Sequence, residues 1–440
     1  MIYPKVTPMK CLLTVILTSL TLAVFILSSN ELSPSLLIVS RIFNPEIRVN
    51  YTPGDFVKYM YLEPANESYC NFNYKLLNDF TFDGEYIDYG PELGKNSPYR
   101  VIYNVISAKA TTDIPKVTYA THVSADFMYY LPELVRYWDG FISVTAFVPD
   151  TDVALVLKQI NQYCHCLPGM SRVSLHFAYS VTTVPLLRNI YFNKPVTCEV
   201  ADSSKIETYR HTNDSVIYPI NVCRNAARTA SLTENVMVSD IQLMPSEGLA
   251  RKFLDMIDQY KLYDCSRNVY VLPIFEVEAN EEIPRRKSQL VELLRENKAV
   301  YFHKLICTHC QKFPGIETWL RTTPSDIVEP LVSARREVPY HRWEPIYIGT
   351  KAEPFYNEML SWEGLQDKML QMLEMCLMEY KFVILDGAFL VHWPGIKKKQ
   401  NQQNEEQWRE PFKKQNSNEY AKILMNLLSR YDAKSECKPY

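Results

Sequence analysis

The 440-residue sequence predicts an α/β fold, with a sheet covered by helices, behind one N-terminal transmembrane helix. Three observations lead to this prediction. Strand and helix patterns alternate along the chain from residue 116 onward. The strand patterns are apolar almost throughout, as in strands buried on both faces. An uncharged run stands near the N-terminus, at residues 11–28, and is long enough for a membrane span.

The composition is that of a globular protein and argues against a nucleic-acid partner. Hydrophobic residues make up 47% of the chain and charged residues 22%, as in folded domains. The formal net charge is −3, whereas nucleic-acid binding usually requires a concentrated basic surface. We therefore expect no nucleic-acid partner. The composition leaves the oligomeric state open.

The apolar run at residues 11–28 is interpreted as a signal anchor. As a helix it would span roughly 27 Å, close to the hydrocarbon thickness of thin internal membranes. Lys5 and Lys10 precede the run, so the positive-inside rule keeps residues 1–10 in the cytosol as a short tail. The alternative is a cleaved signal peptide, whose apolar region is usually shorter and which would be cut near Ser28.

Turn residues and weak periodicity distinguish residues 29–97 from the rest of the chain. Prolines and glycines recur there, and we interpret the segment as a lumenal stem that merges into the domain edge. The folded domain then covers residues 98–440. Within it, the polar stretch 396–416 is expected to form a solvated surface loop.

Inside the folded domain, the predicted elements follow one another in α/β order. Continuous apolar runs indicate strands, and apolar positions three and four residues apart indicate helices. Ligands of such sheets bind at the carboxyl ends of strands. The predicted strands are 117–123, 141–148, 173–180, 235–243, 268–278, 344–350 and 382–393, and the predicted helices are 125–137, 151–164, 219–231, 246–261, 288–297 and 367–381.

Cysteine usage indicates an oxidising compartment. Ten of the 11 cysteines lie outside the apolar run, an even number that fits disulfide pairing. N-glycosylation triplets begin at Asn50, Asn66 and Asn213, which agrees with that compartment. Cys307 and Cys310 invite a zinc interpretation, but zinc needs about four ligands and no second pair accompanies them. We therefore expect both to form disulfides with other cysteines.

An acidic side chain follows the apolar strand that contains Val238. Asp240 stands at the carboxyl end of this strand, where an unpaired buried carboxylate would be costly. A cation held by side chains at i and i+2 of an extended chain is one solution. Gln242 occupies the i+2 position and offers an uncharged amide oxygen. The other interpretation is a strand-end cap or a turn former.

A second polar group follows the last apolar strand. His392 is a potential metal ligand, because imidazole is the commonest one in proteins. Lys397, Lys398 and Lys399 come shortly afterwards and could neutralise a diphosphate. The alternative is an ordinary strand exit followed by a solvated run of charge.

A third group opens the helix that precedes Asp240. Arg224 and Arg228 are four residues apart and therefore share a helix face. Close to a helix N-terminus, they could hold an anionic ligand. A surface pair of arginines bridged to acids is the other interpretation.

Five segments, taken in order, resemble glycosyltransferase family 49, the family of beta-1,4-glucuronyltransferase and of the C-terminal domain of LARGE-type glycan polymerases. The similarity extends from roughly Tyr99 to Gly395 and beyond, which is most of the chain after the apolar run. No single segment would be specific, but the ordered set is. The segments are 121–147, 218–228, 238–249, 354–371 and 382–397.

The resemblance implies a GT-A-like nucleotide-diphospho-sugar transferase domain with a mixed sheet flanked by helices. The implied activity is inverting transfer of a sugar, glucuronic acid or N-acetylglucosamine first of all, from a UDP-sugar to a glycan or glycoprotein acceptor. The implied location is the Golgi membrane, with single-pass type II topology and a lumenal catalytic domain.

The resemblance also assigns a metal and a donor site. It implies Mn²⁺ bound by Asp240, Gln242 and His392, with Gln242 standing where a second acid is usual. Binding of the UDP-sugar is assigned to the segment that opens the helix and to one lysine. These donor-side residues are Arg224, Asn225, Arg228 and Lys397.

Inverting transfer further needs a base on the acceptor hydroxyl, within hydrogen-bond reach. Glu363 and Asp367 are the candidates, and Trp362 could stack against an acceptor sugar. Capping of the following helix is the alternative role for each acid. Because Gln242 removes one carboxylate from the metal motif, an inactive GT-A-like protein that binds glycans or partners an active transferase is the alternative function. A single-pass adhesion ectodomain is disfavoured by the α/β order.

Overall fold

A computed structural model describes residues 68–76, 82, 86–187, 196–198, 206–213, 216–262, 267–398, 403–431 and 436–439, the side chains of 403–406 excepted. The chain divides into two units, Met1–Arg48 and Val49–Tyr440, and every described residue belongs to the second. The predicted tail and anchor therefore lie outside the described residues. Among the helices that are described, none is long and apolar enough to cross a bilayer.

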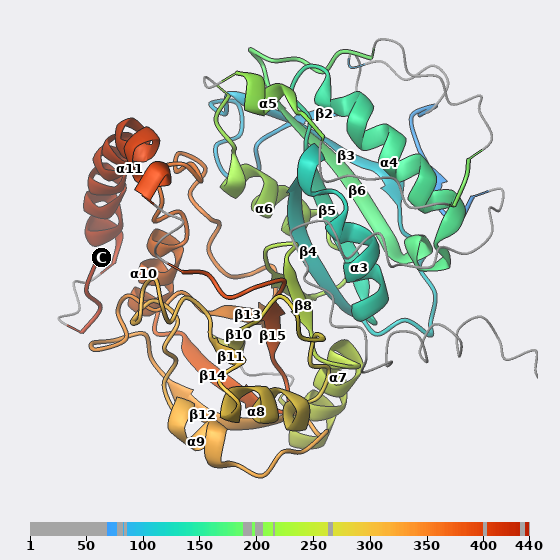
Figure 1. Ribbon diagram of the computed structural model, residues 1–440. Helices are drawn as coiled ribbons and strands as arrows, with labels where there is room; N and C mark the ends of the chain where they lie inside the picture. Colours follow the sequence, from blue (N-terminus) through green and yellow to red (C-terminus); the bar gives the residue numbers. More distant parts are fainter. Residues whose placement is uncertain are drawn as a thin grey trace, which may run out of the picture. The chain divides into compact units, whose positions relative to one another are not determined.

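One mixed sheet of 11 strands runs through the second unit (Figure 1). In spatial order the strands are β1 (Asn71–Phe72), β3 (Tyr99–Ser107), β6 (Val173–Ser180), β5 (Phe141–Phe147), β4 (Val117–Ser124), β7 (Asn235–Val238), β13 (Ile346–Gly349), β9 (Asn268–Leu272), β14 (Lys381–Asp386) and β12 (Glu329–Ala334), with β2 (Ile87–Tyr89) paired to β3. Strands β6, β5, β4 and β7 run parallel, and antiparallel pairs flank them. The predicted mixed α/β class is confirmed.

A second, smaller sheet contains four strands, in the order β11 (Ala299–Tyr301), β10 (Ile274–Val277), β15 (Leu390–His392) and β8 (Leu243–Pro245). Two of them continue strands of the large sheet. Strand β10 follows β9 after Pro273, which has no N–H for the ladder, and β15 follows β14 after Gly387, whose φ is 71°. The predictions of single strands at 268–278 and 382–393 are therefore wrong, because each breaks and changes sheet.

Helices cover both faces of the large sheet (Figure 1). Ala120 of β4 packs against Ala227 on one face, whereas its neighbour Tyr119 packs in the main core with Leu134 and Val156 on the other. Successive strand side chains alternate between faces, which explains this division. The helices are the short 3₁₀ turns η2 (Ala125–Phe127) and η3 (Pro168–Arg172), and α3 (Tyr130–Tyr137), α4 (Asp152–Cys166), α5 (Tyr209–Thr212), α6 (Ile220–Thr229), α7 (Leu249–Tyr260), α8 (Lys287–Arg295), α9 (Ile316–Arg321), α10 (Met369–Leu377) and α11 (Gln403–Arg430).

Three predicted elements are corrected by the structure. The predicted helix 125–137 consists of a 3₁₀ turn and the separate helix α3. The predicted strand 235–243 ends at Val238, so Asp240 lies in the turn before β8. The polar stretch 396–416 is not all loop, because α11 begins at Gln403 and continues through Pro411.

Four disulfides confirm that most of the cysteines pair. The bonds are Cys70–Cys164, Cys166–Cys198, Cys307–Cys310 and Cys376–Cys437. The first of them ties the start of the described chain to α4, while β1 and β2 pair with β3 at the sheet edge. Two expectations are corrected: Cys307 and Cys310 bond to each other, and Cys223 is a buried free thiol. Cys265 lies outside the described residues.

Candidate active site

The turn between β7 and β8 holds Asp240 at the carboxyl end of a parallel strand. Strand β7 pairs with β4 in a register that sets Val238 beside Ala120. Two residues beyond this pair come His122, still within β4, and Asp240, just after the end of β7, and their side chains meet at 3.2 Å. The hydroxyl of Tyr119 donates to the backbone carbonyl of Asp240 at 2.8 Å and fixes the turn.

Three basic side chains contact the carboxylate of Asp240. His122 Nε2 lies 3.2 Å and Arg224 Nη2 lies 3.1 Å from its Oδ1. Lys368 Nζ lies 3.4 Å from its Oδ2. They come from β4, from α6 and from the residue before α10, so three distant parts of the sequence meet at one acid. The Asp240 side chain remains 32% exposed and is the part of this cluster most open to a ligand.

Asp240 is ionised in this environment. Burial raises the pKa of its carboxyl, but the charge of Lys368, the bond from His122 and the charge of Arg224 outweigh burial and hold it well below its usual value. Burial lowers the pKa of His122, so its imidazole is neutral near pH 7. Because the carboxylate only accepts, His122 Nε2 carries the proton and its Nδ1 accepts from the Tyr218 hydroxyl at 2.9 Å.

Arg224 links the two acids that the sequence analysis singled out. Its Nη1 donates to Asp367 Oδ2 and, at 3.0 Å, to Asn221 Oδ1. Burial lowers the pKa of Arg224, but the charges of Asp367 and Asp240 raise it above its usual value, so the guanidinium stays charged. Asp367 and Asp240 therefore belong to one cluster.

Asn225 and Arg228 have a different part in the structure from the predicted one. Arg228 donates to the backbone carbonyls of Glu353 and of Pro354, the latter at 2.9 Å. Asn225 exchanges hydrogen bonds with the backbone of Tyr356, at 2.7 and 3.0 Å. Both side chains are buried. These contacts position residues 353–356, the start of the segment that leads to Glu363 and Asp367.

Glu363 lies in the same segment and is buried. Its Oε1 accepts from Arg210 Nη2 at 2.9 Å and from the backbone N–H of Tyr218 at 3.0 Å. Its Oε2 is buried without a hydrogen-bond partner among the described residues. A buried unpaired carboxylate oxygen is costly, and a hydroxyl group of a ligand would satisfy it. Tyr218 connects Glu363 to His122 and through it to Asp240.

His392 and Gln242 meet where the smaller sheet begins. Strand β15 pairs with β8 so that His392 stands opposite Leu243. His392 Nε2 lies 3.3 Å from Gln242 Oε1. Burial lowers the pKa of His392 well below its usual value, and the charge of Lys397 lowers it further, whereas Asp240 raises it. The imidazole is therefore neutral, and Asp240 is close enough for its charge to affect the pKa of this ring.

The three side chains that the resemblance assigns to Mn²⁺ offer it a single carboxylate. Both oxygens of Asp240 already accept from basic groups. An amide oxygen can only accept, so His392 Nε2 donates to Gln242, and the lone pair of the neutral ring lies on Nδ1, which is buried without a hydrogen-bond partner among the described side chains. Hard cations prefer several oxygen ligands with negative charge among them, and only one carboxylate is present here.

Lys397 is held by a residue that the sequence analysis did not identify. Its backbone N–H donates to Glu276 Oε2 at 3.2 Å, and the N–H of His303 donates to Oε1 of the same acid at 3.2 Å. Lys397 Nζ lies 5.4 Å from the centre of the Phe302 ring. Lys398 pairs with Glu278 at 3.7 Å, and Lys399 lies outside the described residues.

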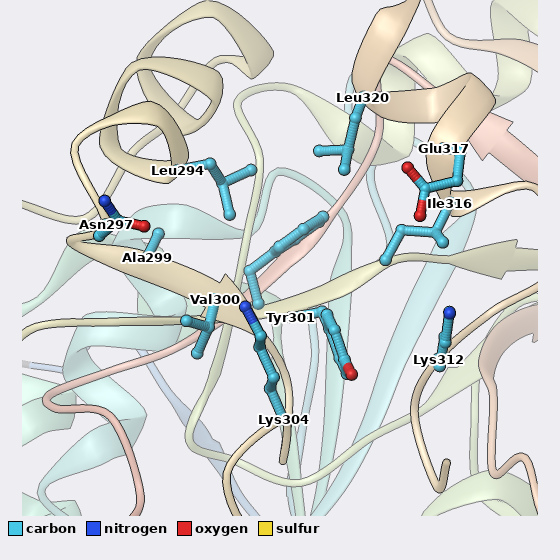
Figure 2. Close-up of a pocket in the computed structure, with 11 residues that line it drawn as sticks. Leu294, Asn297, Ala299, Val300, Tyr301, Lys304, Lys312, Ile316, Glu317 and Leu320 are labelled. Atoms are coloured by element: carbon cyan, nitrogen blue, oxygen red, sulfur yellow. The ribbon is translucent and has the colours of Figure 1, made fainter. Parts of the chain in front are cut away.

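A pocket of about 270 Å³ lies elsewhere, beside β10, β11 and α9. Figure 2 shows its lining, in which Leu294, Ile316 and Leu320 are accompanied by Lys304 and Glu317. It contains none of the predicted site residues, so it is not the place where the acids and basic groups meet.

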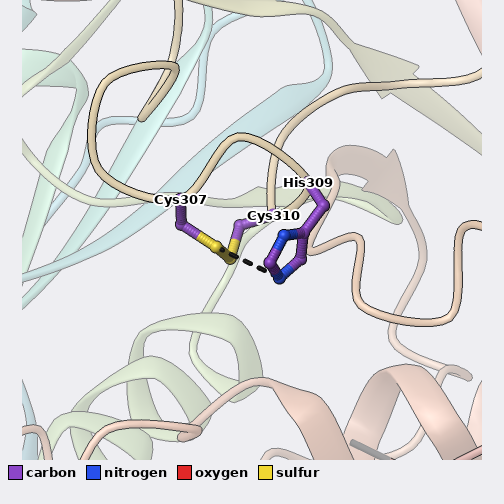
Figure 3. A group of neighbouring side chains, drawn as sticks. All are labelled: Cys307, His309 and Cys310. Atoms are coloured by element: carbon purple, nitrogen blue, oxygen red, sulfur yellow. Dashed lines mark hydrogen bonds between the residues drawn. A yellow bond between two sulfur atoms is a disulfide. The ribbon is translucent and has the colours of Figure 1, made fainter.

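Cys307, His309 and Cys310 form a further cluster (Figure 3). Their potential ligand atoms lie within 4.8 Å of one another, and His309 Nε2 is 3.5 Å from Cys307 Sγ. The two sulfurs are joined in a disulfide, and a zinc ligand must be a thiolate. In this oxidised state the cluster is a disulfide-closed loop and holds no zinc through its sulfurs.

Several residues of the site were missed by the sequence analysis. His122 and Lys368 bind Asp240, and Arg210 binds Glu363. His122 is a basic side chain inside an otherwise apolar strand, and Lys368 directly follows Asp367, so both carried a weak signal. Arg210 had none, because α5 is a four-residue helix far from Glu363 in sequence.

Known proteins resemble this chain in sequence over most of its length. A family model described as glycosyl-transferase for dystroglycan matches residues 116–432. Beta-1,4-glucuronyltransferase 1 of Bos taurus is 27% identical over 317 residues, which are 69% of this chain and 73% of that protein. Xylosyl- and glucuronyltransferase LARGE2 of Mus musculus is 26% identical over 285 residues, or 63% of this chain and 34% of that protein. Among solved structures, S. aureus TarS 1-349 matches with a TM-score of 0.33 and 13% identity over 63% of this chain and 60% of that one.

Proposed function

This chain belongs to the family described as glycosyl-transferase for dystroglycan, and from that premise we propose that it transfers a sugar from a UDP-sugar to a glycan acceptor. Family membership makes it a glycosyltransferase that uses a nucleotide-sugar donor. The proposed sugar is glucuronic acid, or else N-acetylglucosamine, and the proposed outcome at the anomeric centre is inversion. The names of the relatives support glucuronic acid first, since beta-1,4-glucuronyltransferase 1 matches over most of this chain.

One observation carries the proposal. The carboxylate of Asp240, exposed at the carboxyl end of β7, is surrounded by Arg224 and Lys368, and Asp367 joins it through Arg224. An ammonium group at a strand end can position an anionic donor in an α/β fold, and the partly exposed carboxylate beside it can accept hydrogen bonds from sugar hydroxyls. Asp367 and Lys368 belong to the segment 353–368, which also contains Glu363. Asn221 and Asn225 of α6 donate to backbone carbonyls of this segment, and the backbone N–H of Tyr218 donates to Glu363 itself.

We assign the base to Glu363. An acceptor hydroxyl would attack the anomeric carbon of the donor while the bond from that carbon to the UDP oxygen breaks. The hydroxyl proton would pass to Glu363 Oε2, which has no hydrogen-bond partner among the described side chains, and UDP would leave with the bonding electrons. Asp367 is the weaker candidate, because its carboxylate is committed to the buried Arg224.

Two tryptophans next to Glu363 support a glycan acceptor. Trp362 is 37% exposed and Trp408 of α11 is 43% exposed. Their ring centres lie 6.2 Å apart, and Arg409 lies 4.0 Å from the centre of the Trp362 ring. Exposed indole surfaces favour the apolar faces of sugar rings. We therefore propose that the acceptor approaches from the side of α11.

We also propose a Golgi location, with the membrane crossed at residues 11–28 and the transferase domain in the lumen. The uncharged apolar run supports the anchor. Four disulfides support an oxidising compartment for the folded unit. Sequencing the N-terminus of the membrane-bound product tests the anchor, and a new N-terminus near Asn30 would replace it with a cleaved signal peptide.

One observation favours a second candidate function. Gln242 stands where the resemblance implies a second carboxylate, and Asp240 is enclosed by basic groups, which suits an inactive GT-A-like protein that binds glycans or partners an active transferase. The experiment is UDP release from a panel of UDP-sugars by the purified full-length chain, with glycan acceptors present. Release with one sugar supports the transferase. Binding of UDP-sugars without any release would favour the inactive protein.

A further inference from the structure

Arg210 of α5 contacts the carboxylate that we assign as the base, and this contact leads to an inference about the acceptor side of the site. We infer that Arg210 is a positioning residue, which holds one oxygen of Glu363 so that the other is left for the acceptor hydroxyl. The inference rests on the proposed function, in which Glu363 takes the proton of that hydroxyl. It adds α5 to the site, although Arg210 stands 153 positions before Glu363 in the sequence.

The carboxylate of Glu363 is held through a single oxygen. Arg210 Nη2 donates to Oε1 at 2.9 Å, and the backbone N–H of Tyr218 donates to the same oxygen at 3.0 Å. Oε2 is buried and receives no hydrogen bond from the described residues. The two donors on Oε1 fix the direction of the carboxyl group, and the hydroxyl of a ligand would supply the donor that Oε2 lacks.

Two aromatic rings also hold the guanidinium of Arg210. Its Cζ lies 5.2 Å from the ring centre of Tyr218 and 5.3 Å from a ring centre of Trp362. Cations within about 6 Å of a ring centre are attracted to the face of the ring. The Arg210 side chain is only 17% exposed, so most of it is held by these neighbours. Because Trp362 is the ring that we propose for acceptor stacking, Arg210 lies where the proposed base and the proposed acceptor surface meet.

Contacts that do not involve the guanidinium hold α5 in place. The backbone N–H of Tyr209 donates to Oδ1 of Asp152, a buried residue at the start of α4, at 2.7 Å. The N–H of His211 donates to Oγ1 of Thr208, the N-cap residue, at 3.3 Å. A four-residue helix has little stability of its own, so these contacts set the backbone of Arg210. We therefore expect truncation of the Arg210 side chain to leave α5 in place and to remove only the contacts of the guanidinium.

The test is acceptor-dependent UDP release by the full-length chain in detergent, with the UDP-sugar and glycan acceptor on which the natural protein turns over. Arg210→Ala should lower kcat by about tenfold or more, because the base is no longer directed at the hydroxyl. The KM for the UDP-sugar and the dissociation constant of UDP in calorimetry should stay within about twofold. Arg210→Lys keeps a charged donor and should recover part of the lost kcat. Arg286→Ala breaks an exposed arginine–glutamate pair of the same length, 2.9 Å, and is the matched control.

A double variant distinguishes positioning of the base from a merely structural role. If Arg210 acts through Glu363, adding Arg210→Ala to Glu363→Gln should lower kcat by no more than about a further twofold, because the glutamine already lacks the base. A structural role elsewhere would lower kcat again by the full factor. Thermal unfolding of each variant checks that it is folded. Arg210→Gln takes the place of an alanine variant that does not fold, and the same criteria apply to it.

The outcomes separate this inference from the proposed function. Loss of kcat in Arg210→Ala and not in Arg286→Ala, with UDP binding unchanged and no further loss in the double variant, supports it. Turnover of Arg210→Ala within about threefold of the natural protein overturns it and leaves the transferase in place. Fully additive losses, or a loss explained by weaker UDP binding, overturn it in the same way. Failure of the natural chain to release UDP from every UDP-sugar of the panel overturns the proposed function instead.

Discussion

Asn416 of α11 lies directly against Gly364, the residue that follows the proposed base. A Cβ atom added to Gly364 would lie 2.1 Å from Cγ of Asn416, a separation that no packed structure tolerates. Asn416 is buried, and its Nδ2 donates to the backbone carbonyls of Ser361 at 2.9 Å and of Leu365 at 2.8 Å. The side chain of Asn416 therefore positions the segment that carries Glu363.

Gly364→Ala should destabilise the protein by about 1–3 kcal/mol, because an added methyl group must push Asn416 out of its bonds. Chemical denaturation measures this loss. Asn416→Ala is the matched variant: it removes the obstructing amide together with its hydrogen bonds. The double variant should cost less than the sum of the two single changes, since the clash no longer occurs. Strict additivity would show that the two side chains do not meet.

Gln242→Glu should create a metal site that the natural side chain does not provide. It adds a second carboxylate beside Asp240 and keeps an acceptor for His392, so we expect Mn²⁺ affinity to rise by about tenfold or more in calorimetry. Gln259→Glu makes the same change of charge on an exposed face of α7 and serves as the control. An unchanged affinity would mean that position 242 does not contribute a ligand.

The large sheet could be predicted from the sequence because its parallel strands are continuous apolar runs. The breaks at Pro273 and Gly387 could not, since the apolar run continues across each of them. An apolar run indicates only that residues are buried. The strands before and after each break are both buried, one in the large sheet and the other in the smaller sheet. Helix α11 was missed for a different reason: its polar side chains and Pro411 resemble those of a loop.

The candidate site was predicted in part. Asp240 was recognised as an acid at the end of an apolar strand and Arg224 as a cation near the start of a helix, and the structure brings them together at 3.1 Å. Asn225 and Arg228 looked equivalent to Arg224 in sequence, but the direction of their side chains depends on a segment more than 120 residues away. Lys368 was overlooked although it directly follows Asp367, because its contact with Asp240 depends on how α10 packs.

Glu363→Gln should remove the base and leave donor binding intact. We expect acceptor-dependent UDP release to fall by about a hundredfold or more, the usual range for loss of a general base. The UDP dissociation constant should stay within about twofold, because Glu363 contacts Arg210 and Tyr218 and not the cluster around Asp240. Glu410→Gln, which changes an exposed acid on α11, is the control. Turnover within about threefold of the natural protein would remove Glu363 from the mechanism.

The paired acids Glu92 and Glu358 should make stability fall as the pH rises above about 5. The pKa of Glu92 is raised from 4.5 to about 7, because burial and, to a smaller degree, the charge of Glu358 outweigh the hydrogen bond from the N–H of Glu358, which lowers it. The folded protein therefore holds this proton more tightly than the unfolded chain. The stabilisation is complete below about pH 4.5 and is lost as the pH passes 7. Asp152 and Glu276, whose pKa values burial raises to about 6, act in the same direction.

Melting temperatures between pH 5 and 8 check this prediction, and Glu92→Gln isolates the contribution of one acid. The glutamine cannot titrate, so the slope of melting temperature against pH should flatten between about 4.5 and 7, the ordinary and the folded pKa of Glu92. The absolute melting temperature is a separate matter, because Oε2 of Glu92 accepts the N–H of Glu358 at 2.6 Å and an amide nitrogen there would not. A slope identical to that of the natural protein would show that Glu92 is already ionised in the fold at pH 5.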